Sequence, residues 1–388
     1  MTSPSGELTA YAAARVHPLD GTGVLLGGSV IVEGDRVVRV AAPGDVPAGA
    51  ALVDLGDVDL APGFVDLQVN GGGGALFNDV QDVACLRTIA EAHRRFGTTS
   101  LLPTLITDRT ETIAAARAAV NEAVDVVPGV VGVHFEGPFL DERKRGAHDA
   151  SLVRDPAPGD LDAMFEGARG VTLVTAAARR LKGGLREELR ARGAIVSLGH
   201  CASTAVEAAA EFDSGVALVT HLYNAMSPLQ HRAPGVVGAA FAHDRVVCGL
   251  IADGVHVDMA AARAAWKALG TDRLALVTDA VHPVGTDMTE FELGGQRVTL
   301  EDGRCVNEEG NLAGSALDMA SAVRGAVEGM GAPLADALAM ASRTPARAIG
   351  LEAELGSLRP GARADLVALG PDLAVSAVVQ GGALVVQS

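Results

Sequence analysis

The sequence predicts an α/β protein, a (β/α)8 TIM-like barrel with a small β-sandwich domain built from both termini. Apolar strand-like runs alternate with Ala-rich helical stretches through the middle of the chain. Repeated βα units of this number favour a barrel over an open sheet. Short β-type runs punctuated by glycine occur near both ends. No GxGxxG follows a strand-like run, so the usual reason to expect a Rossmann fold is missing.

The two ends of the chain share one pattern of short strands separated by turn residues. The runs that fit this pattern are 24–26, 29–32, 36–40, 364–369, 377–379 and 383–387. We therefore expect residues 1–61 and 351–388 to form one small β domain and residues 62–350 to form the catalytic barrel.

The middle of the chain supplies the strands and helices of the barrel. Its strand candidates are 130–135, 171–175, 194–198, 216–220, 246–251 and 273–278. Helical stretches include 203–211 and 259–269, the second opening after Asp258 as a cap.

Charge and composition restrict the class of partner. The 388 residues carry a formal net charge of -17, which argues against nucleic acid and anionic membranes. Only 3% of residues are aromatic, which leaves little for stacking on bases. A small anionic substrate is still compatible with this net charge, because a few cationic groups placed at a site can outweigh the negative potential of the whole protein.

The cysteines and apolar runs indicate the compartment. The four cysteines are widely spaced and form no CxxC pair, as expected of reduced thiols. The start of the chain lacks a basic segment followed by an apolar one, and no apolar run is long enough to span a membrane. We expect a cytoplasmic protein.

Five ionisable residues fall at or just beyond the ends of different predicted strands: Glu136, His200, His221, His256 and Asp279. In a barrel these carboxyl ends converge on the face where active sites are built. Any one of the histidines alone would more often be a structural residue. Together they predict an active site.

Glu136, His200 and His221 are the best candidates for metal ligands. One carboxylate and two imidazoles supply the protein part of a hydrolytic zinc site and leave a position for water. A metal in such a site lowers the pKa of that water toward neutrality. Zinc is the first choice, with Fe2+ or Co2+ as alternatives.

Three further residues have two interpretations each. Asp279 is either the general base or a helix N-cap. His148 lies on a charged loop and either contacts the substrate or is solvated. Arg232 is suited to a phosphate because its planar fork donates in pairs, although a lone surface arginine is usually solvated.

Several motifs together resemble one known family. PGFVDLQVNGGGG, HFEGPF, KRGAHD, SLGH, THLYNAM, IADGVHVD, VTDA and LAGSALDM occur in the order found in the N-acetylglucosamine-6-phosphate deacetylase branch of the amidohydrolase superfamily. The resemblance covers nearly the whole chain. HFEGPF, THLYNAM and ADGVHVD are specific to this branch, whereas PGFVD is shared across the superfamily.

The resemblance implies metal ligation by Glu136, His200 and His221 and proton transfer by Asp279. It implies that His256 lies near the acetyl carbonyl or the sugar phosphate. We hypothesise that His148 or His256 polarises the substrate carbonyl, and the sequence leaves open which one does. The resemblance also implies a homodimer. The implied substrate contacts are Ala147, Asn224, Ala225, Arg232, Asp253, Gly254, Val255, His256, Leu312, Ala313 and Gly314.

Gln68 and Asn70 stand where many superfamily members carry the HxH that helps to hold a second metal. Neutral amides are poor zinc ligands beside imidazole, so we predict one tightly bound divalent metal per subunit. The expected reaction is hydrolysis of N-acetyl-D-glucosamine 6-phosphate to D-glucosamine 6-phosphate and acetate. A metal-activated water attacks, with Asp279 as general base and acid, in amino-sugar catabolism and cell-wall sugar recycling.

Three alternatives remain. The substrate could be a related amino-sugar phosphate such as N-acetylgalactosamine 6-phosphate. The chain could be a catalytically silent sugar-phosphate binder, which the amides at 68 and 70 motivate. A cyclic-amide hydrolase on the same barrel is disfavoured, because the chain lacks HxH and a lysine clearly placed at a strand end.

Overall fold

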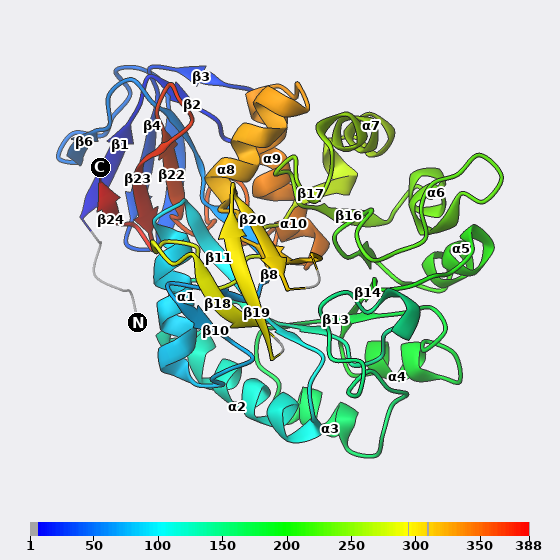
Figure 1. Ribbon diagram of the computed structural model, residues 1–388. Helices are drawn as coiled ribbons and strands as arrows, with labels where there is room; N and C mark the ends of the chain where they lie inside the picture. The colour runs from blue at the N-terminus through cyan, green and yellow to red at the C-terminus, as the bar shows by residue number, and fades with distance from the viewer. Residues whose placement is uncertain (1–6, 294, 309, 388) are drawn as a thin grey trace.

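The computed structural model describes residues 7–293, 295–308 and 310–387. Its centre is a parallel eight-stranded sheet in the order β17-β16-β15-β14-β13-β12-β11-β8, which is rolled into a barrel (Figure 1). The strands are β8 (Phe64–Val69), β11 (Thr98–Ile106), β12 (Gly132–Glu136), β13 (Val171–Ala176), β14 (Ile195–Leu198), β15 (Leu218–Val219), β16 (Val247–Leu250) and β17 (Leu274–Leu276). The barrel closes where the Asp279 N–H donates to the Gln68 carbonyl at 2.9 Å. The predicted barrel class is confirmed.

Helices cover the outside of the barrel between successive strands (Figure 1). They are α1 (Val83–Arg94), α2 (Thr110–Val126), α3 (Asp160–Phe165), α4 (Leu185–Ala191), α5 (Ala205–Asp213), α6 (Gly235–Ala242), α7 (Met259–Leu269), α8 (Met319–Arg324), α9 (Leu334–Ala341) and α10 (Arg343–Ala348). Short turns of helix are η1 (Glu142–Lys144), η2 (Thr271–Arg273) and η3 (Gly325–Gly329). The Asp258 side chain accepts from the Ala260 N–H and caps α7, as predicted. The predicted helix 203–211 lies at α5, where Thr204 and Glu207 form a capping box.

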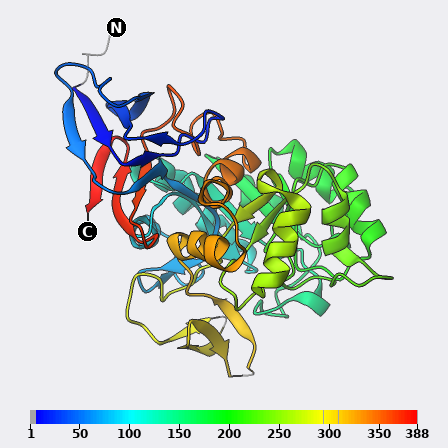
Figure 2. The same cartoon turned by 90° about the horizontal axis from the view of Figure 1, so that it is seen from above.

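Strands from both ends of the chain share the smaller sheets. These strands are β1 (Leu8–Ala12), β2 (Arg15–Val16), β3 (Leu25–Leu26), β4 (Ser29–Glu33), β5 (Arg36–Ala41), β6 (Ala51–Asp54), β7 (Asp59–Pro62), β22 (Leu366–Leu369), β23 (Val375–Gln380) and β24 (Ala383–Gln387). β7 pairs with β22, which joins the two ends in one six-stranded sheet. Figure 2 shows the blue and red strands side by side. The domain limits at residues 61 and 351 stay a prediction, and residues 1–6 and 388 lie outside the described residues.

An antiparallel insertion after β17 was not predicted from the sequence. It consists of β18 (Glu290–Leu293), β19 (Gln296–Glu301), β20 (Arg304–Asn307) and β21 (Leu312–Ser315). Leu293, Val298 and Cys305 form a small core with Leu76 and Val281. This insertion is the yellow segment in front of the barrel in Figure 1, and it stands out from the body in Figure 2. A two-stranded ribbon of β9 (Gly71–Gly72) and β10 (Ala75–Leu76) follows β8.

No helix among the described residues combines the length and apolar character needed to cross a bilayer.

Candidate metal centre and active site

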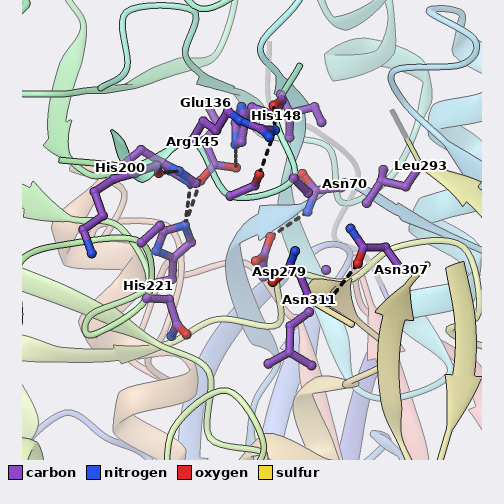
Figure 3. A pocket seen from close by; sticks show the side chains of 18 of the residues that line it. Asn70, Glu136, Arg145, His148, His200, His221, Asp279, Leu293, Asn307 and Asn311 are labelled. Atoms are coloured by element: carbon purple, nitrogen blue, oxygen red, sulfur yellow. Dashed lines mark hydrogen bonds and ion pairs between the residues drawn. The ribbon is translucent and has the colours of Figure 1, made fainter. Parts of the chain in front are cut away.

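The predicted site residues meet at the carboxyl end of the barrel. Glu136 is the last residue of β12, His200 and His221 each lie two residues beyond β14 and β15, and Asp279 lies three beyond β17. All four line one cavity of about 500 Å³. Figure 3 shows His200 and His221 pointing toward each other and Asp279 facing Asn70. The strand-end pattern therefore predicted a real convergence of side chains.

Glu136, His200 and His221 bring three ligand atoms together. Glu136 Oε1 lies 3.2 Å from His200 Nε2 and 3.0 Å from His221 Nε2, and the two Nε2 atoms are 3.0 Å apart. A tetrahedral zinc ion with bonds of about 2 Å separates its ligands by about 3.3 Å. Three acceptor atoms this close require a shared positive charge, which a proton or a divalent cation supplies. The cluster therefore fits a divalent metal site.

The pKa values of the cluster residues also support a cation site. Burial works against ionisation of Glu136, but hydrogen bonds from His200 and His221 outweigh it and hold the pKa of Glu136 well below its usual range. Burial lowers the pKa of His221, but the hydrogen bond to Glu136 prevails and raises it to about 9. Both pKa shifts have one cause, which is that the Glu136 carboxylate stabilises a positive charge beside it.

The partner of Nδ1 distinguishes a ligand from a donor at His200 and His148, whereas His221 Nδ1 is buried without a hydrogen-bond partner among the described residues. His200 Nδ1 lies 2.8 Å from the Lys144 carbonyl, which can only accept a hydrogen bond. Nδ1 therefore carries the proton, and Nε2 keeps its lone pair toward the cluster. This arrangement is typical of metal-ligating histidines.

His148 shows the opposite arrangement. The ligand atoms of Glu136, His148 and His200 also lie within 4.8 Å of one another, so distance alone would admit His148 as a ligand in place of His221. However, His148 Nδ1 lies 2.8 Å from the Thr107 hydroxyl, which can donate or accept, and 3.3 Å from the Thr107 backbone N–H, which can only donate. The backbone contact favours an accepting Nδ1. The proton is then on Nε2, 4.0 Å from Glu136 Oε2. Burial and the nearby His200 charge lower the pKa of His148 to about 3, which keeps the ring neutral. We interpret His148 as a donor.

This interpretation predicts different results for two histidine variants. His148→Ala should keep the metal content of the wild type but lower kcat by about a hundredfold or more, as loss of an oxyanion donor does. His200→Ala should lose the metal, because its lone pair is part of the cluster. Elemental analysis of both purified variants makes the comparison. Loss of metal from His148→Ala would show that His148 is a ligand.

Asp279 is held by two amide side chains. Gln68 Nε2 donates to Asp279 Oδ1 at 3.0 Å and to Glu136 Oε1 at 3.1 Å. Asn70 Nδ2 donates to the same Asp279 oxygen at 2.7 Å. Burial, and then the negative charge of Glu136, raise the pKa of Asp279 above its usual value. A carboxylate with a raised pKa, held beside the cluster, is suited to receive and return a proton.

Three of these residues adopt a backbone conformation that is uncommon for residues with a side chain. The φ angles are 45° at His200, 29° at His221 and 52° at Asp279. Such angles cluster at functional sites, where the surrounding structure maintains them. Here they turn the chain sharply just past β14, β15 and β17.

The other predicted contacts divide into two groups. His256 lines the cavity, and its Nδ1 lies 2.6 Å from Asp253 Oδ2, so Asp253 orients the ring. Ala147, Asn224, Ala225, Leu312 and Gly314 also line the cavity. Arg232 is exposed, and the residues outside the lining are Arg232, Asp253, Gly254, Val255 and Ala313.

Two sets of lining residues were missed from the sequence. Arg143, Lys144 and Arg145 border the cavity, and the pattern KR before GAH was a visible signal of local positive charge. Arg143 is engaged by Asp141 at 2.7 Å. The second set comes from the insertion after β17, and its members are Leu293, Gln296, Asn307 and Asn311. Turn signals at Gly295 and Gly303 marked this insertion, but nothing in them indicated that it faces the site.

Comparison with known proteins identifies the class. The model of the amidohydrolase family matches residues 60–385. The chain belongs to the amidohydrolase family.

Within that family the relatives are deacetylases of amino-sugar phosphates. The chain is 45% identical to N-acetylgalactosamine-6-phosphate deacetylase of Shewanella sp., over 85% of this chain and 84% of that protein. It is 35% identical to N-acetylglucosamine-6-phosphate deacetylase of Haemophilus influenzae, over 92% and 95%. The crystal structure of N-acetylglucosamine-6-phosphate deacetylase from Pasteurella multocida superposes with a TM-score of 0.94 at 35% identity, covering 98% of this chain and 100% of that chain.

Proposed function

We propose that this chain hydrolyses the N-acetyl group of an amino-sugar 6-phosphate, releasing acetate and the free amine. One observation carries the proposal: Gln68 Nε2 donates to both Glu136 and Asp279, so the Asp279 carboxylate lies beside the Glu136–His200–His221 cluster. A binder would have no need for a base beside a metal site. Relatives at 35–45% identity that are named as such deacetylases support the same activity.

Glu136, His200 and His221 are the residues that would hold the metal, and we propose zinc, with Fe2+ or Co2+ as alternatives. A nitrogen–nitrogen–carboxylate set suits zinc and leaves room for a further ligand. When bound, the metal supplies Lewis acidity and makes water a nucleophile near neutral pH. We expect a single ion per chain, because Gln68 and Asn70 direct N–H groups rather than lone pairs at Asp279.

The proton transfers follow from the placement of this chain's own side chains. Asp279 takes a proton from the attacking water as the new C–O bond forms at the acetyl carbon. His148 Nε2–H donates to the acetyl oxygen, on which negative charge develops. Asp279 then returns its proton to the nitrogen as the C–N bond breaks. The amine and acetic acid leave, the acid gives its remaining proton to solvent to become acetate, and Asp279 is again a carboxylate.

Binding of the phosphate requires positive charge at the cavity. Lys144 and Arg145 line the cavity. Arg145 Nη1 donates to the His148 carbonyl at 3.0 Å, which ties its position to the reacting end. We propose that Arg145 and His256 contribute to phosphate binding. Arg232 and the backbone of 253–255 remain predicted contacts, as do a homodimer and a cytoplasmic location.

The sugar epimer distinguishes two candidate substrates. N-acetylglucosamine 6-phosphate is the substrate we propose first, because the specific motifs HFEGPF and THLYNAM resemble that branch. N-acetylgalactosamine 6-phosphate is the second candidate, which the 45% identity to the Shewanella deacetylase favours. The two sugars differ only in the direction of one ring hydroxyl.

A substrate panel tests this proposal. We expect kcat/KM for an N-acetylhexosamine 6-phosphate to exceed that of the same sugar without phosphate by at least about a hundredfold, because charge-assisted hydrogen bonds to the phosphate are lost. Amine release should be measured for the gluco, galacto and manno compounds, each with and without phosphate. Comparable rates without phosphate would contradict the assigned substrate class. If no compound of the panel releases an amine, the chain is a catalytically silent sugar-phosphate binder.

A further inference from the structure

Only one of the two polar atoms in the Asn70 side-chain amide forms a hydrogen bond. Its Nδ2 donates to Asp279 Oδ1, whereas Asn70 Oδ1 has no hydrogen-bond partner among the described residues. The residue is only 3% exposed, yet it lines the cavity. Figure 3 shows it beside Asp279, on the side of His148. A buried acceptor without a donor is costly, so a bound molecule is expected to supply one.

The orientation of this amide is fixed by its neighbour. Asp279 Oδ1 accepts from both Gln68 and Asn70, and a carboxylate oxygen does not donate. The Asn70 nitrogen must therefore face Asp279, which leaves the oxygen facing the cavity. Since both atoms are attached to one carbon, a group that donates to Asn70 Oδ1 also lies next to the Asp279 carboxylate.

We propose that Asn70 Oδ1 accepts a hydrogen bond from the N–H of the scissile acetamide. This holds the leaving nitrogen beside Asp279, the group that returns a proton to it. The contact also selects amides over esters and thioesters, which have no hydrogen on the scissile atom and would leave the acceptor unpaired. The inference rests on the proposed deacetylase function and adds a substrate-contacting residue to it.

A second cation is the other ligand that an amide oxygen could bind, and the surrounding donors disfavour it. The N–H groups of Gln68 and Asn70 point at Asp279 Oδ1, and Gln68 also points at Glu136. A cation placed at Asp279 Oδ1 would therefore face two N–H groups, each of which carries partial positive charge. A neutral donor such as an amide N–H meets no such obstacle.

The experiment compares two variants on two substrates. The substrates are the N-acetyl sugar 6-phosphate and its thioester analogue, in which sulfur replaces the scissile N–H. Asn70→Ala removes the unpaired acceptor and one donor to Asp279. Gln68→Ala is the control for lost support of Asp279, because it removes the other donor to Asp279 Oδ1, together with one to Glu136 Oε1, and Gln68 does not line the cavity. Asn70→Leu, which has a side chain of similar size and no acceptor, is used if Asn70→Ala fails to fold.

We expect Asn70→Ala to lower the ratio of amide to thioester kcat/KM by about tenfold, the effect of one hydrogen bond. The ratio for Gln68→Ala should stay within about twofold of the wild type. An unchanged ratio in Asn70→Ala overturns the inference. An equal fall of the ratio in both variants also overturns the inference, because the change then results from the lost hydrogen bond to Asp279 and not from the lost acceptor of Asn70. A wild-type protein that leaves the amide intact would refute the proposed function itself.

Discussion

Asp279→Asn is expected to lower kcat on the N-acetyl sugar phosphate by about a thousandfold or more. General acid–base catalysis contributes about 10²–10⁴ to the rate, and in the proposed mechanism one side chain performs both proton transfers. The asparagine oxygen can still accept from Gln68 and Asn70, which donate at 3.0 Å and 2.7 Å, so the local hydrogen bonds survive. The replacement therefore removes the proton-transferring function with little change in shape. Steady-state kinetics with the metal-loaded variant measures the loss.

The control for this variant is another buried carboxylate of the same barrel. Asp66 is fully buried on β8, accepts from the Thr278 hydroxyl at 2.5 Å and does not line the cavity. Asp66→Asn should change thermal stability more than kcat. Both variants should retain the wild-type metal content. If Asp279→Asn turns over at a rate near that of the wild type, another group must carry the proton.

Much of the barrel could be predicted because its signal is local. The alternation of apolar runs with Ala-rich stretches indicates where strands and helices lie, and the helix predicted at 259–269 begins and ends as α7 does. The site residues were found for a related reason. A barrel gathers its strand ends, so polar residues that end different strands must approach one another. The sequence range 216–220 was nevertheless too long, because β15 covers only Leu218–Val219 before the chain turns toward His221.

The parts that could not be predicted depend on contacts between distant segments. The insertion from β18 to β21 packs Leu293 and Val298 on Leu76 and Val281, and no local pattern specifies that partner. The role of His148 depends on the Thr107 N–H, which lies 41 residues away in the sequence. The exposed position of Arg232 is likewise a property of the folded loop, whereas its residue type alone suggested a phosphate ligand.

Removal of the metal is expected to abolish turnover, with a loss on the order of a thousandfold or more, because Lewis-acid stabilisation of several kcal/mol disappears. Chelation should also lower Tm, since an ion that binds only the folded chain stabilises it. The apo protein would then keep Glu136, His200 and His221 together only through a shared proton. Zinc added at about one equivalent per chain should restore both activity and Tm, measured by kinetics and calorimetry on the same sample.

A pair of histidine variants separates loss of the metal from general damage to the cavity. His221→Ala removes one of the three converging atoms, so it should purify without stoichiometric metal and should not regain activity with zinc. His256→Ala changes another histidine of the same cavity, one that is bound to Asp253 at 2.6 Å rather than to the cluster. It should keep the metal and show mainly a raised KM. A His221→Ala protein with full metal content would mean that His221 is not a ligand. Two ions per wild-type chain would mean that the amides of Gln68 and Asn70 do not exclude the second.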